Sequence, residues 1–382
     1  MTPQPIPEDL FCPNPDCPAY GLTAASSVHC HSRKEQRYRC TRCEKTFAAT
    51  ACTPFYRLHK AAEVFTIVVT LLSLGCPLQA IVVAFALDER TVAAWLRRAG
   101  THAEHLHHHL VETEQVAEPH LQADELWAKL VGHRVWVAMA LGATTRLWLG
   151  GCLSVTRDLA LIRRLVTGVR TCLADRNVLV CVDGLASYVT IFDEVFRDRI
   201  PLGGRLQLVK RVLPEGFQLG QVIKQRVKYR LKSVTRRAVV GTEAGILAVL
   251  AATGTGTQIH TAYIERINAT FRASLACLAR RGRALARQDA TLTAGMYLVG
   301  TTYNFCRPHR SLRGRAVAER TAAADHGRLT GVRRGQRRRL RQSAVKRFSG
   351  WVARPSAVTR SSWVPTLNAP YVSLAFLSTR IS

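Results

Sequence analysis

Three carboxylates far apart along the chain are the residues most able to do chemistry together. Asp124 falls in "ADELW", Asp183 ends "VCVD", and Glu265 lies in "YIERINATF". If the fold gathers them, their charges repel one another, and divalent cations that prefer hard oxygen ligands relieve the repulsion. Two such cations can activate an attacking oxygen and stabilise the leaving one at a phosphodiester. The pattern therefore predicts a Mg²⁺ or Mn²⁺ site with these residues as ligands and catalytic groups.

The stretch around Glu265 surrounds this acid with cations. We expect a helix over residues 260–285, on which Asn268 and Arg272 share a face with Glu265 because they follow it by three and seven positions. The stretch also offers basic side chains for phosphates: Arg266, Arg280 and Arg281. The competing interpretation is that Glu265 is a salt-bridge partner on a solvated face.

Other acids compete with the three for a role in the site. Glu125 follows Asp124 directly, and Asp175 precedes the stretch that ends at Asp183. Strand alternation places Glu125 on the opposite face from Asp124, so only one of these two is expected to point at the site. Taken singly, each acid is more often a surface or structural residue than a ligand.

The elements expected to position these acids form an α/β region over about residues 121–310. The segments "DELWAKLV", "RVWVAMAL", "RLWLGGCLSV", "NVLVCVDG" and "RLQLVKRV" have strand patterns, and "RDLALIRRLVTGVRTCL" and "ASYVTIFDEVF" have helical patterns. This order predicts a mixed α/β sheet. In a ribonuclease-H-like sheet the first and fourth strands are neighbours, which would bring Asp124 to Asp183, and a later helix can carry Glu265 across the sheet end.

A second candidate metal site opens the chain. Cys12 and Cys17 form one pair and Cys40 and Cys43 another. Four thiolates in two such pairs can hold Zn²⁺ tetrahedrally, and the binding energy then substitutes for a missing core. Cys30, between two histidines, is an alternative ligand. A purely structural ribbon for protein contacts is the alternative to a DNA-contacting one.

Short helices follow the cysteines. "AAEVFTIVVTLLSLG" reads as a helix ended by glycine, "PLQAIVVAFAL" as a second, and Asp88 as the N-cap of a third that ends at Gly100. Together they describe a helix-turn-helix whose last helix carries the DNA-binding candidates Arg90, Arg97 and Arg98. A plain three-helix bundle is the alternative. The histidines at 102–109 are expected to be a solvated, partly basic connector.

The overall charge points to an anionic partner. The chain has 382 residues, 54 Lys and Arg against 26 Asp and Glu, and a net charge of +28. Double-stranded DNA is the expected partner. Twelve unevenly placed cysteines indicate a reducing compartment, here the cytoplasm, in association with the nucleoid. Residues 64–87 are apolar but broken by Gly75 and Pro77, so we expect no membrane span.

These features taken in order resemble a known family. The set "CPNPDC…QRYRCTRCEKTF", the helix-turn-helix, "ADELW", "VCVDG", "YIERINATFRASLACLARRGRAL" and "YNFCRPHRSL" is similar to DDE transposases of bacterial insertion sequences, of the small-element type with an N-terminal zinc ribbon. The resemblance covers about residues 12–312 and implies a ribonuclease-H-like fold, with Asp124, Asp183 and Glu265 as the metal-binding triad. It implies cleavage at transposon ends and attack of the freed 3′-hydroxyl on target DNA. The first cysteine pair is wider than usual.

The expected organisation has four parts. They are a zinc ribbon (1–52), a helix-turn-helix with linker helix (53–118), a catalytic domain (119–320) and a basic tail expected to be disordered (321–382). The expected function is that of a transposase, active as a homodimer or higher assembly because two ends must be held together. A non-catalytic DNA-binding regulator, an inactivated remnant or a non-transposing nuclease are the alternatives.

Overall fold

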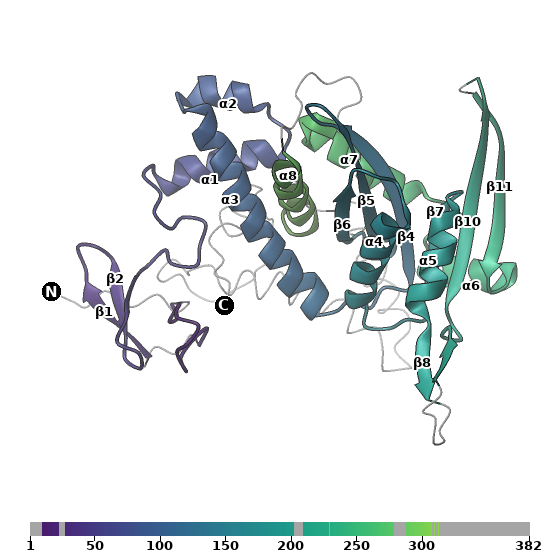
Figure 1. The fold of residues 1–382 in the computed structure, drawn as a ribbon, viewed down its shortest axis with the longest axis horizontal. Coiled ribbons are helices and arrows are strands. Elements are labelled where there is room, and N and C mark those ends of the chain that lie inside the picture. The colour runs from purple at the N-terminus through teal and green to yellow at the C-terminus, as the bar shows by residue number, and fades with distance from the viewer. Residues whose placement is uncertain are drawn as a thin grey trace, which may run out of the picture.

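The computed structural model describes residues 10–22, 27–201, 209–228, 230–278, 288–307, 309 and 312. It is a mixed α/β structure with a six-stranded mixed sheet, preceded by three helices and a small cysteine-bearing sheet (Figure 1). Arg280, Arg281 and the tail from residue 321 were singled out by the sequence and lie outside the described residues.

The central sheet places the predicted acid-bearing strands side by side. Its order is β11-β10-β7-β4-β5-β6, with β4–β7 and β7–β10 parallel and the other pairs antiparallel. The bounds are β4 His120–Lys129, β5 Arg134–Gly142, β6 Trp148–Ser154, β7 Leu179–Asp183, β10 Gln218–Val227 and β11 Arg230–Val240. The prediction that the first and fourth strands of the region are neighbours is confirmed.

The last predicted strand was misplaced. Of "RLQLVKRV", residues 205–208 lie outside the described residues, and Val209–Val212 form β9. Its partner among the described strands is β8 (Asp198–Pro201), in a separate two-stranded ribbon. The sheet is completed instead by β10 and β11, which the sequence patterns did not reveal. Their outer halves lack apolar alternation because those side chains face solvent, so the hydrophobic signal of a strand is missing there.

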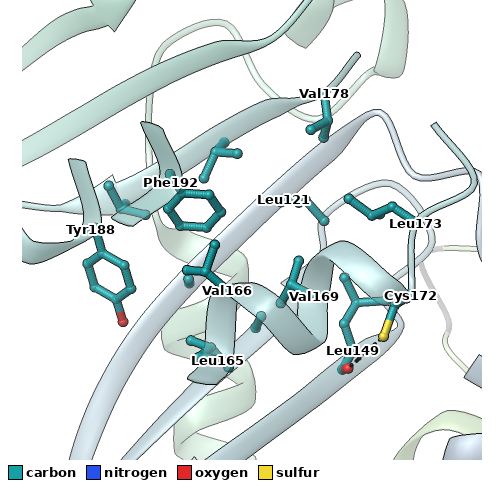
Figure 2. Close-up of a cluster of buried hydrophobic side chains, with 14 of the residues drawn as sticks. Leu121, Leu149, Leu165, Val166, Val169, Cys172, Leu173, Val178, Tyr188 and Phe192 are labelled. Carbon is teal, nitrogen blue, oxygen red and sulfur yellow. Dashed lines mark hydrogen bonds between the residues drawn. The ribbon is translucent and has the colours of Figure 1, made fainter. Parts of the chain in front are cut away.

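Helices cover both faces of the sheet. On one face, α4 (Leu159–Thr171) and α5 (Ala186–Phe196) bury Val166 and Phe192 against Leu121 and other strand residues (Figure 2). The other face is covered by α6 (Glu243–Thr253), α7 (Ala262–Ser274), a 3-10 turn at Ala276–Leu278 and α8 (Asp289–Thr301). Each face thus has its own apolar core, which fixes where the strands end and where the acids emerge.

The helices before the sheet follow the predicted pattern. They are α1 (Ala62–Ser73), α2 (Leu78–Phe85) and α3 (Glu89–His107). Gly75, with φ of +90°, follows the end of α1, and Pro77 precedes the first turn of α2. The Asp88 side chain accepts a hydrogen bond from the Arg90 backbone at 2.8 Å and caps α3, as expected. Among the described helices none is long and apolar enough to cross a membrane.

The predicted end of α3 at Gly100 is wrong. The helix continues to His107 and then into a π-helical turn at His108–Thr113. A Cβ on Gly100 would lie 2.4 Å from the Ala294 carbonyl oxygen, so this glycine permits the close approach of α8 rather than a helix stop. The histidines are not uniformly solvated either, because His102 and His107 are buried along this contact.

The first described residues form a unit with a very small core. Strands β1 (Val28–Ser32), β2 (Arg37–Cys40) and β3 (Thr46–Ala48) make an antiparallel sheet. Its apolar cluster contains few large side chains besides Leu10, Val28 and Phe47, and cysteines supply much of the rest. A second π-helical turn, at Thr302–Cys306, ends the main described part of the chain.

Two candidate metal centres

The first candidate centre is an acidic cluster at the end of β7, beside the middle of β4. Because β4 and β7 are parallel and Ala123 lies opposite Val182, the next residues, Asp124 and Asp183, emerge together. Asp124, Glu125 and Asp183 each offer a carboxylate oxygen, and these oxygens all lie within 4.8 Å of one another. Two of the three predicted acids therefore meet, and a residue that the sequence argument had set aside joins them.

The expectation that only one of Asp124 and Glu125 can point at the site is wrong. Alternation itself holds, because the Tyr188 hydroxyl from α5 donates to Glu125 at 2.8 Å, on the face opposite α7. However, pairing between β4 and β7 stops at Ala123. Beyond Ala123 none of the described strands lies beside β4 at its β7 edge. The longer Glu125 side chain can therefore reach around this edge to the carboxylates of Asp124 and Asp183.

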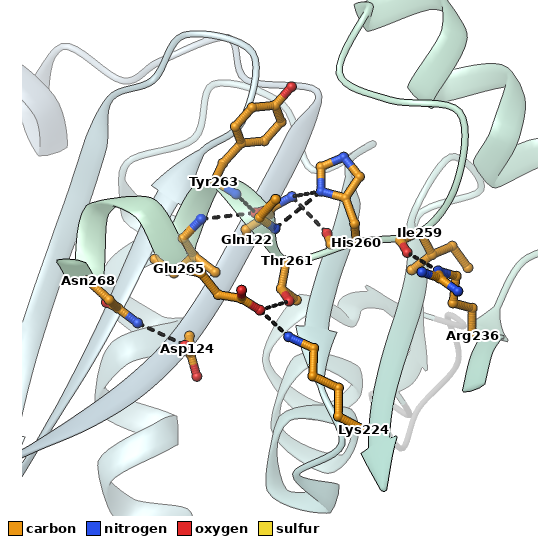
Figure 3. A network of polar contacts seen from close by, with 12 residues as sticks. Gln122, Asp124, Lys224, Arg236, Ile259, His260, Thr261, Tyr263, Glu265 and Asn268 are labelled. Carbon is orange, nitrogen blue, oxygen red and sulfur yellow. Dashed lines mark hydrogen bonds and ion pairs between the residues drawn. The ribbon is translucent and has the colours of Figure 1, made fainter. Parts of the chain in front are cut away.

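Glu265 does not belong to this cluster. Among the described residues, the acidic group whose ligand atoms all lie within 4.8 Å contains Asp124, Glu125 and Asp183 alone. The Glu265 carboxylate accepts hydrogen bonds from the Lys224 ammonium and, at 2.8 Å, from the Thr261 hydroxyl (Figure 3). The ion-pair interpretation of Glu265 is thus realised, with a lysine on β10 rather than with the arginines of its own helix.

Helix α7 nevertheless touches the cluster through Asn268. The Asn268 side chain is buried, and its amide donates to Asp124 Oδ2 at 2.8 Å (Figure 3). Arg272, one turn further, is half-buried, while Arg266 is exposed. On this face of α7, Asn268 is therefore the residue that contacts the acidic cluster. Glu265 lies one turn earlier, in the first turn of the helix.

The charge of Glu265 affects the pKa of Asp124 even though the Glu265 oxygens lie outside the cluster. Burial raises the pKa of Asp124 to about 7, with further increases from the Asp183 and Glu265 carboxylates and opposition from Lys224 and Arg272. Burial also acts to raise the pKa of Glu265, but the hydrogen bonds from Lys224 and Thr261 bring it below its ordinary value. Several negative charges thus share one site.

The donor set fits a hard divalent cation. The carboxylates repel one another in the absence of a cation, and oxygen ligands suit Mg²⁺ and Mn²⁺. The buried Oδ1 atom of Asn268 accepts no hydrogen bond from the described residues. Arg157, which forms ion pairs with Glu125 and at 3.9 Å with Asp183, partly neutralises the cluster from the opposite face.

The second candidate centre is the cysteine cluster. Cys12, Cys17, Cys40 and Cys43 lie close together, as predicted, and can hold a zinc ion. The sulfurs of Cys12 and Cys43 are 3.6 Å apart and those of Cys17 and Cys40 are 3.7 Å apart. A tetrahedron with Zn–S bonds of 2.3 Å has edges of about 3.8 Å, so these two distances fit such an edge, and all four sulfurs lie within 4.8 Å of one another.

Backbone groups support the same reading of the cysteines. The amides of Ala19 and Arg42 donate to the sulfurs of Cys17 and Cys40, each at 3.4 Å. The backbone hydrogen bond from Lys45 lowers the pKa of Cys43 to about 7, which favours a thiolate. The alternative prediction of Cys30 as a ligand is wrong, because Cys30 lies exposed on β1, outside the cluster.

The three arginines predicted on the helix-turn-helix differ in environment. Arg90 and Arg97 are exposed on α3. Arg98 is half-buried, and its guanidinium donates to the Tyr56 carbonyl oxygen. Arg98 therefore has a structural contact in addition to any role on the surface.

Three residues around the acids were not predicted from the sequence, namely Arg157, Tyr188 and Lys224, and Glu125 was predicted only as a competitor of Asp124. Lys224 could have been found only by recognising β10, because the pairing of Val222 with Asp183 puts the lysine just past the acids. Arg157 lies in the loop before α4 and Tyr188 lies on α5, and neither position can be read from spacing alone.

The chain matches no known family model, and no curated protein is similar to it in sequence at a significant level.

Proposed function

We propose that this protein is a DDE transposase that binds the terminal inverted repeats of an insertion sequence and cleaves and transfers DNA strands. The supporting observation is that Asp124 and Asp183 meet where the pairing of two parallel neighbouring strands stops, in the middle of β4 and at the end of β7, the first and fourth strands of their region. That arrangement is the one expected of a ribonuclease-H-like domain. Glu265 lies on α7, which contacts the same cluster through Asn268.

In this proposal Asp124, Asp183 and Glu265 hold Mg²⁺ or Mn²⁺. Bound there, the cations would supply activation of the attacking oxygen and stabilisation of the leaving one. Asn268 keeps one Asp124 oxygen in place, and Tyr188 and Arg157 hold the Glu125 carboxylate beside the two aspartates. Glu265, with its side chain 47% exposed, has room to leave Lys224 and turn toward Asp124. Lys224 and Arg272 are then available to substrate phosphates.

The N-terminal units are proposed to recognise the transposon ends. The four cysteines would form a zinc ribbon, and α2 with α3 a helix-turn-helix that presents Arg90 and Arg97 to DNA. The left-handed Ala86, with φ of +47°, ends α2 and makes the tight turn before α3. A homodimer or higher assembly follows from the need to hold two ends and a target.

The test is Mg²⁺- or Mn²⁺-dependent nicking of duplex DNA that contains the element's end. Asp183→Asn should lower the nicking rate at least about a hundredfold, because losing a ligand costs no less than losing its supporting shell. Asp175→Asn is the matched control, since Asp175 hydrogen-bonds only locally to Asn177. Equal nicking by Asp183→Asn and the parent chain would overturn the catalytic assignment.

A non-catalytic DNA-binding regulator is the second candidate, and the ion pair between Glu265 and Lys224 favours it. Under this alternative the pair persists when metal and DNA are added, and the protein binds ends without cutting them. A nuclease on the same fold would cut but would not join a cut 3′ end to a target, so a strand-transfer assay separates it from a transposase.

A further inference from the structure

A strongly basic exposed feature of the described chain is the outer half of the β10–β11 hairpin, here called the basic ribbon, residues 223–228 and 230–235. β10 pairs with β7 only as far as Val222, which lies opposite Asp183. Beyond that point β10 and β11 continue as a two-stranded ribbon out to the pair Val227 and Arg230. Figure 1 shows these two strands extending past the end of β7.

The charge of the hairpin is of one sign. No acid occurs between Gln221 and Val240. Its exposed cations are Lys224, Arg226, Lys228, Arg230, Lys232, Arg236 and Arg237. Two of them have roles within the fold, since Arg236 donates to the Ile259 carbonyl oxygen and Arg237 to the Gln221 side chain. The cations toward the tip therefore repel one another in the free protein, and a second copy of the same ribbon would add to that repulsion.

The ribbon begins at the acidic cluster. Val222 lies opposite Asp183, and the next residue on the same face of β10, Lys224, contacts Glu265. Strand alternation puts Arg226 on that face as well. The five residues from Ile223 to Val227 extend about 17 Å, or roughly five base pairs of B-DNA. A polyanion that follows this face is led to the acids.

We propose that the basic ribbon binds duplex DNA through its backbone phosphates and holds the duplex against the acidic cluster. The inference rests on the proposed function and adds to it a DNA-binding surface separate from the helix-turn-helix and the helix α7. A two-stranded ribbon fits the major groove of B-DNA, and its lysines and arginines suit phosphates without sequence preference. The contact is therefore general for duplex DNA, unlike recognition of transposon ends.

The experiment measures duplex binding by the full chain as a function of salt, using a DNA without the element's end sequence. The test variant is Arg226→Gln/Arg230→Gln/Lys232→Gln. The matched control is Arg199→Gln/Lys210→Gln/Arg211→Gln, which removes three exposed cations from the other two-stranded ribbon, β8–β9. In Figure 1 the β8 strand points away from the tip of β10 and β11.

The expected result is a fall of about three in the slope of log affinity against log salt for the test variant, and little change for the control. The conservative variant Arg226→Lys/Arg230→Lys should keep the parent slope. Equal losses in test and control variants would overturn the proposal, and so would an unchanged slope in the test variant. If the test variant shows the reduced salt slope but the parent chain never nicks DNA, the proposal of a transposase is refuted and the proposal of a DNA-binding ribbon is supported. If nicking depends on Asp183 but the test variant keeps the parent's salt slope, the transposase is supported and the DNA-binding ribbon is refuted.

Discussion

The cysteine centre and the acidic centre are both clusters of metal-binding side chains, but they are assembled in different ways. The cysteine centre joins two short turns within residues 12–43, in a unit with little apolar core. The acidic centre joins residues from separate strands of a sheet that has a large core on each face. The first should need its metal in order to fold, whereas the second should fold without metal and bear a cost in electrostatic repulsion.

The groups that contact the two clusters also differ in kind. Backbone amides donate hydrogen bonds to the sulfurs of Cys17 and Cys40. Around the acids, the protein supplies its own cations, Arg157 and Lys224, as substitutes for an ion. The cysteine unit is thus expected to fold only with bound zinc, whereas the acidic cluster is held by ion pairs that a bound cation can replace.

The largest expected effect is at the cysteine centre. Replacing Cys17 by serine, or removing zinc with a chelator, should unfold residues 10–48, because structural zinc contributes roughly 10–16 kcal/mol to such units. Loss of the corresponding amide signals in NMR, with the signals of the α/β region unchanged, would be the readout. The control is Cys30→Ser, which lies outside the cluster and should leave the signals in place. Amide signals that persist after chelation would break the comparison.

A smaller effect of opposite sign is expected at the acidic centre. The pKa of Asp124 is raised to about 7, so the folded state holds this proton more tightly, and stability is lost as pH rises from about 4 through 7. At pH 8 and without metal, Asp124→Asn should therefore stabilise the protein. The gain is about 2–3 kcal/mol, after allowing for one of the hydrogen bonds from Asn268 and the Glu125 amide that an asparagine cannot accept.

Chemical denaturation with and without Mg²⁺ measures this effect. Mg²⁺ should stabilise the parent chain and leave Asp124→Asn nearly unchanged, which reverses or removes the difference between them. A destabilised Asp124→Asn chain in the absence of metal would show that the carboxylates do not repel one another as inferred.

The smallest of the three effects is a loss of stability at acid pH, caused by a buried histidine of α3 that packs against the sheet. His107 is buried against Trp148, and burial lowers its pKa to about 4. The unfolded chain binds this proton more readily, so stability is lost as pH falls from about 6.5 toward 4. Between pH 7 and pH 5 the loss due to His107 is about 2 kcal/mol. His107→Phe should flatten the pH dependence of the unfolding free energy by that amount, and parallel curves for the two proteins would contradict the assignment.

Much of the fold could be predicted from the sequence, for local reasons. Asp88 was recognisable as a helix cap because an acid before a helical pattern satisfies free backbone amides, and it does so here. The cysteine ligands were recognisable because their spacing is nearly the whole geometry of the site. The neighbouring positions of Asp124 and Asp183 followed once strand order was inferred.

The remainder depended on contacts between distant segments. Gly100 was taken for a helix stop, yet its role depends on Ala294 in a helix much later in the chain. Alternation predicts that only one of Asp124 and Glu125 points at the site, which is sound within a strand but does not account for where the neighbouring strand ends. Lys224, the partner of Glu265, lies on a strand whose solvated residues carry no apolar pattern.

The central claim is that Asp124, Asp183 and Glu265 form one divalent-metal site, and a crystal structure of the protein with Mn²⁺ and end-containing DNA tests it most directly. The account predicts Mn²⁺ bound by oxygens of all three residues, with Glu265 turned away from Lys224 and Lys224 near a phosphate. Mn²⁺ held by Asp124, Glu125 and Asp183, with Glu265 still paired to Lys224, would contradict it.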